Sequence, residues 1–151
     1  MGGMVVLSQV LDSIERCVVA ATSYQQTPGI ITVASVPSSR VDGMFSLELQ
    51  SRNTGREAER VVLRVAHELT VRFVARVNPA KAPSSYRDAL EREERLIRAL
   101  LVQSAIPSVR TSWTATRRTL TPSREQLVVE VLFSLEHYFP LDDAPTTPGN
   151  S

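Results

Sequence analysis

The two histidines are the side chains of this sequence best suited to chemistry. His67 and His137 fall in the inward register of two long predicted strands, which could bring them together. Two imidazoles with a carboxylate can form a metal site. No third histidine or nearby cysteine accompanies them, and the nearest carboxylates, Glu68 and Glu136, fall on the opposite strand face. We therefore expect two structural histidines and no bound metal.

Other catalytic signals are missing from the sequence. It contains no nucleophile motif, no glycine-rich phosphate loop and no cysteine pair, and Cys17 falls among the apolar residues of a predicted helix. Glu91, Glu93 and Glu94 form no inward carboxylate pair of the kind that acid–base catalysis needs. We expect a protein that is not an enzyme and needs no cofactor.

Arginines are concentrated in one stretch without acidic residues, at Arg110, Arg117, Arg118 and Arg124. Such a cluster could contact phosphates, form interfacial ion pairs with acidic neighbours, or make up a solvated strand face. Trp113 is the one aromatic residue within the stretch, and the whole chain has a formal net charge of only +1. This balance argues against specific nucleic-acid binding, and the other two interpretations stay open.

The length and composition favour one domain. The chain has 151 residues, 42% of them hydrophobic and 22% charged, which is typical of a globular domain. We expect a single α+β domain over residues 1–141. Residues 142–151 contain two prolines and a glycine without hydrophobic periodicity and are expected to be a disordered tail. No run approaches the roughly 18 apolar residues that span a membrane, and we expect no membrane partner.

Hydrophobic periodicity predicts the elements. Apolar residues at helical spacing predict amphipathic helices over residues 5–21 and 85–104, and Ser85 with Asp88 resembles a capping box. Alternation predicts strands over residues 44–49, 61–77, 109–120 and 127–139. Asn53-Thr54-Gly55 indicates a turn joining the first two strands. Residues 22–43 read as a loop, with a possible short strand at residues 30–34.

These elements occur in the order α-β-β-α-β-β. The pattern predicts an α+β fold, with an antiparallel sheet of two long hairpins and two helices packed on one face. The strand over residues 61–77 is much longer than the usual five or six residues. Its opposite face and that of the last strand are also partly apolar, with Val62, Val74, Val128, Leu132 and Tyr138. A second apolar face of this kind indicates a partner.

The order of elements resembles the tail terminator family of long-tailed bacteriophages, which includes lambda-like tail terminators and tail-to-head joining proteins. The resemblance covers residues 4–141. It depends on the first amphipathic helix, the hairpin at Asn53-Thr54-Gly55, the long strand running into Arg76-Val77-Asn78, the charged helix and the closing strand from Leu127.

The resemblance implies a structural protein without a cofactor, which forms a ring, typically hexameric, at the head-proximal end of the tail tube. Such a ring ends tube polymerisation and provides the docking surface for the head. The implied partners are further copies of the chain, the tail tube protein and a head connector or neck protein. The implied location is the virion tail or neck, after assembly in the cytoplasm of the host bacterium.

The resemblance also implies functional positions. A loop facing the tube or the connector would match the hairpin tip, with Arg52, Asn53, Arg56 and Glu57, and a second candidate for such a loop is Gln25 to Asp42. Charged residues along one face of the long strand are candidates for subunit contacts, namely Arg64, Glu68, Arg72 and Arg76. The alternative for this second set is ordinary solvated strand charges.

Two other functions remain open at this stage. A neck or head-completion adaptor would fit many of the same observations but binds the portal instead of the tube, and co-sedimentation with tubes or with portal complexes distinguishes the two. A nucleic-acid-binding or small-molecule-binding α+β module predicts exposed aromatic residues or a polar pocket. Aromatic residues make up only 5% of this chain.

Overall fold

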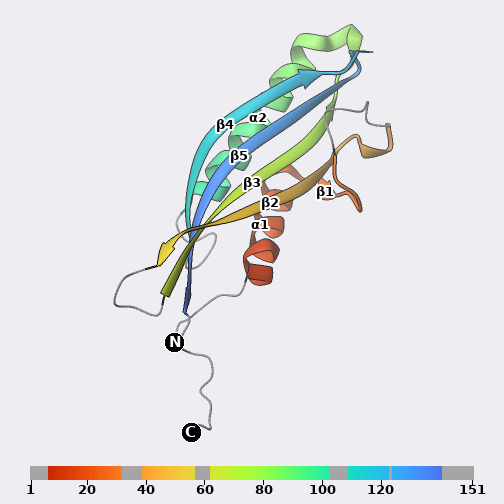
Figure 1. Cartoon of the computed structure of the whole chain (residues 1–151). Helices are drawn as coiled ribbons and strands as arrows, with labels where there is room; N and C mark the ends of the chain where they lie inside the picture. The colour runs from red at the N-terminus through yellow and green to blue at the C-terminus, as the bar shows by residue number, and fades with distance from the viewer. Residues whose placement is uncertain (1–6, 32–38, 57–61, 103–108, 123, 141–151) are drawn as a thin grey trace, which may run out of the picture.

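Two helices lie on one side of a long twisted sheet (Figure 1). The computed structural model describes residues 7–31, 39–56, 62–102, 109–122 and 124–140. Its elements are α1 (Leu7–Thr22), β1 (Gln25–Gln26), β2 (Met44–Arg56), β3 (Val62–Arg76), α2 (Ala82–Leu101), β4 (Val109–Leu120) and β5 (Gln126–Pro140), with short 3-10 turns at Ser39–Val41 and Pro79–Lys81. The α+β class is confirmed. The expected tail, residues 142–151, lies outside the described residues.

The strand order in the sheet is β1-β2-β3-β5-β4. The two predicted hairpins are β2–β3 and β4–β5, and they join through the antiparallel pairing of β3 with β5. The prediction of a purely antiparallel sheet is wrong at one edge, because β1 pairs in parallel with Met44 and Phe45 of β2. β1 has only two residues, so the predicted loop contained no hydrophobic pattern that could reveal it. Ile30 and Ile31 are not in a strand, and the rest of the predicted short strand, residues 32–34, is not described.

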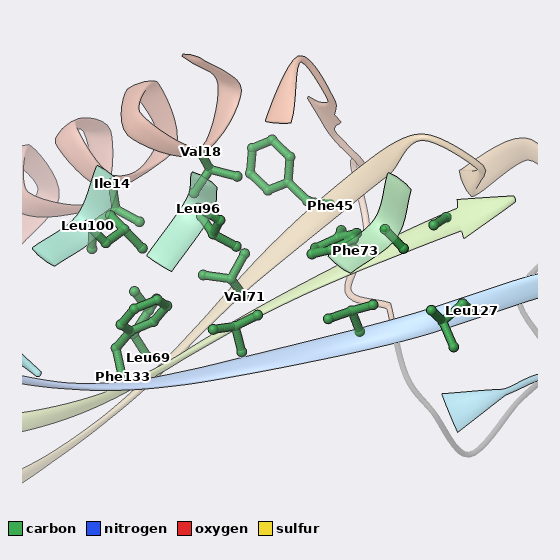
Figure 2. Packing of buried hydrophobic residues seen from close by; sticks show 14 of the residues in the cluster. Ile14, Val18, Phe45, Leu69, Val71, Phe73, Leu96, Leu100, Leu127 and Phe133 are labelled. Carbon is green, nitrogen blue, oxygen red and sulfur yellow. The ribbon is translucent and has the colours of Figure 1, made fainter. Parts of the chain in front are cut away.

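The core lies between the helices and the inward face of the sheet. On α1, Val10, Ile14 and Val18 recur every four residues and are fully buried. On β3, Leu69, Val71 and Phe73 face them at every second residue, as the predicted alternation required. Figure 2 shows residues from both helices and three strands meeting in this layer. Burial of these side chains provides most of the free energy that holds the helices on the sheet.

The first hairpin is longer than its turn signal indicated. Asn53 and Gly55 are part of β2, which continues to Arg56, and the pairing with β3 shifts register between them. The prediction that Asn53-Thr54-Gly55 forms the hairpin turn is therefore wrong. The long alternation of β3 offers pairing partners beyond this point, so β2 continues and absorbs the turn residues as an irregularity. Figure 1 shows the tips of β2, β3 and β5 extending past the helices.

The second helix begins earlier than predicted. α2 starts at Ala82, with proline at one of its first positions, so Ser85 and Asp88 lie inside it and form no capping box. The Ser85 hydroxyl instead accepts a hydrogen bond from the Asn78 backbone N–H at 3.1 Å, while the Asn78 side chain caps the short 3-10 turn. The chain therefore enters α2 through two consecutive helical turns without a break.

The end of α1 is held by α2. The Thr22 hydroxyl donates to the Val18 carbonyl at 2.7 Å, and Ser23 adopts a left-handed φ of 61°, which ends the helix. Arg92 donates to the Thr22 carbonyl, and Arg95 donates to the Ala21 carbonyl at 3.2 Å. These arginines satisfy carbonyl groups that a helix end leaves without intrahelical partners.

Part of the outward sheet face is covered by the chain itself. Val74 and Val128 are buried there against Ile31 and the half-buried Val41, in a second small apolar cluster. The Ile31 backbone N–H donates to the Ser46 hydroxyl at 3.1 Å, which fixes this loop on the sheet. At this end of the sheet, the apolar outward residues need no partner chain, contrary to the sequence-based expectation. Leu132 is half-buried, and the side chains of Val62 and Tyr138 are not described.

Candidate functional site

The two histidines do come together, as the register predicted. The ring centroids of His67 and His137 lie 5.8 Å apart, and both side chains are buried on the helix side of the sheet. Ser51 Oγ and His67 Nδ1 lie 2.6 Å apart, so β2 orients the His67 ring. The Nε2 atom of His67 is buried and has no hydrogen-bond partner among the described residues.

The environment of His67 favours its neutral imidazole. Burial lowers the pKa of His67 below its ordinary value of 6.5, and the neighbouring His137 lowers it further. Within the described residues, no group of three or more His, Cys, Asp or Glu side chains is placed to hold a metal ion. Protonation of the buried His67 ring would therefore oppose folding.

The four residues of β3 proposed for subunit contacts lie in different environments. Arg72 is only 18% exposed and forms ion pairs with Glu48 of β2 and, at 2.5 Å, with Glu130 of β5. Arg72 thus joins three strands of its own chain. Glu68 and Arg76 are exposed on the same face, whereas the side chain of Arg64 is not described. Of this set, the described side chains available to another molecule are those of Glu68 and Arg76.

The proposed tip residues are mostly beyond what the structure describes. Arg52 is exposed near the end of β2, and Asn53 and Arg56 belong to the same strand, although their side chains are not described. Glu57 lies outside the described residues. Arg52, Asn53 and Arg56 therefore lie at the end of β2 that extends past the helices.

A buried ion pair between α2 and β4 was missed by sequence reasoning. Both carboxylate oxygens of Glu93 accept hydrogen bonds from Arg118, at 2.8 Å from Nε and 2.7 Å from the terminal nitrogen. The Glu93 side chain is 7% exposed. The available signal was a glutamate on the apolar stripe of a predicted helix, which requires a cation from another element.

The arginine cluster is divided by strand alternation. Arg118 points to the helix side, whereas Arg110 and Arg117 lie opposite Glu136 and Glu130 in the register with β5. Arg124 occupies the β4–β5 turn with a left-handed φ of 62°. Two of the four arginines thus have an acidic residue of β5 opposite them, and a third, Arg118, is paired with Glu93 of α2.

A polar hollow of about 320 Å³ lies between the start of β2 and α2. Arg92 lies over the Tyr24 ring at 4.3 Å from its centroid, and burial raises the pKa of Tyr24. Asp42, on its wall, accepts a hydrogen bond from Gln126 at 2.5 Å. Much of the polar lining is therefore engaged by the fold itself.

The two edges of the sheet are the remaining prominent feature. Among the strands that the structure describes, β4 forms one edge, and β5 is its only pairing partner. At the other edge, β1 pairs only with Met44 and Phe45, and no described segment continues this pairing along β2. Edge strands present N–H and C=O groups that a further strand can pair with. This arrangement can accept a strand from another polypeptide.

Comparison with known proteins gives no family assignment. No protein-family model matches the chain, and no curated protein matches its sequence. In the part of the chain that the structure describes, no helix has both the length and the apolar character needed to cross a membrane.

Proposed function

We propose that this chain is a structural protein, without enzymatic activity, that forms a homo-oligomeric ring at the head-proximal end of a phage tail tube. In this role it ends polymerisation of the tube protein and offers a docking surface to the head connector or neck. It functions in the virion after assembly in the host cytoplasm. The proposal originates in the resemblance of the element order to tail terminators.

The single observation that supports it best is that, among the described residues, no outer strand covers β4 at one edge of the sheet or β2 beyond Phe45 at the other. The helices cover one face, and Ile31 and Val41 cover one end of the other face, so the unused bonding capacity lies mainly at the edges. An element with two different free edges can add copies head to tail. When successive copies are related by rotation about one axis, without translation along it and by an angle that divides the full turn, such a series closes into a ring.

The charges at the centre of the outward face do not form a basic surface. Arg72 pairs with both Glu48 and Glu130 across β2, β3 and β5, so this group carries one net negative charge. A protein that bound nucleic acid through this sheet would need an excess of unpaired cations. Assembly with other protein subunits is therefore the function that these strands support.

The test measures mass and shape in solution. Purified protein is examined by light scattering coupled to gel filtration and by negative-stain microscopy, alone and with assembled tail tubes of the same phage. We expect a ring with a central opening, or a ring that caps one end of each tube. A monomer that neither forms rings nor binds tube ends contradicts the proposal.

Co-sedimentation with portal or neck complexes, carried out in parallel, distinguishes a tail terminator from a neck adaptor. Binding to tubes alone or to both partners supports the terminator role. Binding to the portal side alone contradicts it in favour of an adaptor.

A further inference from the structure

The edge strands are apolar on their helix side. Trp113 lies opposite Phe133 and Leu120 lies opposite Leu127, so both face the helix layer, yet they are 48% and 44% exposed. On β2, Leu47 and Leu49 face the same side and pack against the core while remaining half-buried. Each edge thus carries two side chains of the core layer that the chain itself does not fully cover.

A groove lies directly beside the β4 edge. It has a volume of about 410 Å³ and is lined by Val77, Ala82, Pro83, Tyr86, Arg118, Leu120 and Leu127. Tyr86 is also among the exposed large side chains. A strand added to β4 would direct every second side chain to this side of the sheet, where apolar side chains find the groove. The occupant that fits is therefore an extended segment with apolar residues at alternate positions.

Charge determines which strand is the better partner. β4 contains Arg110, Arg117 and Arg118 and no acidic residue, so a β4–β4 pairing between two copies would place arginines near arginines. From Ser46 to Gln50, β2 carries Glu48 as its only charge, with Leu47 and Leu49 at alternate positions, and Arg52 and Arg56 follow further along the strand. The Ser46–Gln50 part of β2 in a second copy therefore offers a carboxylate and alternate apolar residues to the Leu120 end of β4, whereas β4 of a second copy offers no carboxylate.

Strand direction agrees with this choice. β2 and β3, β3 and β5, and β5 and β4 are all antiparallel, so β2 and β4 run in opposite directions within one chain. When copies are related by rotation about an axis along the strands, β4 of one copy meets β2 of the next as an antiparallel pair. The helices of both copies then lie on the same side of the joined sheet.

We infer that β4 of one copy pairs antiparallel with β2 of the next copy, from Ser46 onward, as the repeating junction of the ring. Leu120 of one copy then contacts the Leu47 and Leu49 layer of its neighbour, and the groove beside Leu120 is filled. This inference rests on the proposed function, since it specifies how the ring closes.

Cysteine cross-linking tests the junction. In a Cys17→Ser background, Ser112→Cys or Thr119→Cys on β4 is combined with Gln50→Cys or Arg52→Cys on β2, all at exposed positions on the outward face. A short bis-maleimide should join the double variants into a ladder of oligomers and leave single variants unlinked. Circular dichroism confirms that each variant is folded.

A charge placed on each side of β4 provides a matched second test. Leu120→Glu places a carboxylate in the inferred contact, and Thr119→Glu places one on the outward face of the same strand. Leu120→Glu should weaken self-association by about tenfold or more, as for loss of a buried interface contact, and Thr119→Glu should have a much smaller effect. Equal effects contradict the inferred contact.

The outcomes distinguish the junction from the ring. Links between single β4 variants would indicate β4–β4 pairing and overturn the inference. Rings of full mass in which no β4–β2 combination cross-links would also overturn it, while the proposed function stands. A wild-type protein that stays monomeric even on tail tubes overturns the proposed function and the junction together.

Discussion

Glu93 and Arg118 are joined by two hydrogen bonds, of 2.8 Å and 2.7 Å, and this pair connects the middle of α2 to β4 near the sheet edge. The carboxylate is almost completely buried, with 7% of its side chain exposed, whereas the arginine side chain is 35% exposed. Without Arg118, the Glu93 carboxylate would have little access to water, whereas Arg118 without Glu93 would still be partly solvated. Hydrogen bonding to Glu93 is also the main reason why the pKa of Arg118 is raised.

Removal of the arginine should destabilise the protein more than neutralisation of the glutamate. Arg118→Ala leaves a buried carboxylate without its cation and should cost about 2 kcal/mol, below the full range for buried pairs because Arg118 is partly solvated. Glu93→Gln leaves Arg118 able to reach water and should cost about 1 kcal/mol or less. Urea unfolding of each variant measures the difference. Arg117→Ala, at the neighbouring exposed position, is the control and should change stability by about 0.5 kcal/mol or less.

Arg72 should be more important to stability than to assembly. Arg72→Met keeps most of the side-chain volume but leaves Glu130, with 10% of its side chain exposed, without this ion pair. We expect a loss of about 2 to 3 kcal/mol in the free energy of unfolding. Arg76→Met, four residues further along β3 and exposed, should change it by about 0.5 kcal/mol or less. Similar losses in the two variants would show that Arg72 has no special role in the sheet.

Stability should decrease as the pH falls below about 6.5. The folded-state pKa of His67 is lowered by burial and by His137, so the unfolded chain binds a proton at this site more readily than the native protein. The contribution of neutral His67 is thus fully present above its unfolded pKa of about 6.5 and is lost as the pH falls through the window below it. Urea unfolding at pH values from about 5 to about 8 measures how the free energy of unfolding changes with pH. His67→Gln should flatten the curve in this window, and an unchanged slope would assign the effect to other groups.

The loop over the outward face provides a comparison between adjacent isoleucines. Ile31 is 5% exposed and packs with Val74 and Val128, whereas Ile30 is 55% exposed. Ile31→Ala should destabilise by about 2 kcal/mol, at the lower end for buried isoleucine because the cluster is small. Ile30→Ala should change stability by about 0.5 kcal/mol or less. Thermal and urea unfolding of the two variants decide whether this loop is a structural part of the sheet.

Periodicity was sufficient to predict the long elements. The alternation that continues through Leu69, Val71 and Phe73 located β3, and the four-residue repeat of Val10, Ile14 and Val18 located α1. These patterns persist because each long element buries one face against the same core. The inward register of His67 and His137, and hence their proximity, followed from the same alternation.

Local signals failed where tertiary pairing competes with them. Asn53-Thr54-Gly55 has the composition of a turn, but the continuing partner strand extends β2 through it. β1 pairs with β2 although Gln25 and Gln26 have no hydrophobic alternation. The Arg118 partner of Glu93 is 25 residues away in sequence, and only the packing of α2 against β4 reveals it. The edge strands likewise follow from the order of the strands in the sheet, which the sequence-based prediction of individual strands does not provide.

Trp113 is the chain's only tryptophan, and it lies on an edge strand, where its indole N–H donates to the Thr116 hydroxyl at 3.0 Å. An indole in this position changes its emission when water is removed from around it. Intrinsic fluorescence therefore reports coverage of the β4 edge without any added label. A blue shift on concentration, in protein that remains folded throughout, would locate subunit contact at this strand by a spectroscopic measurement alone.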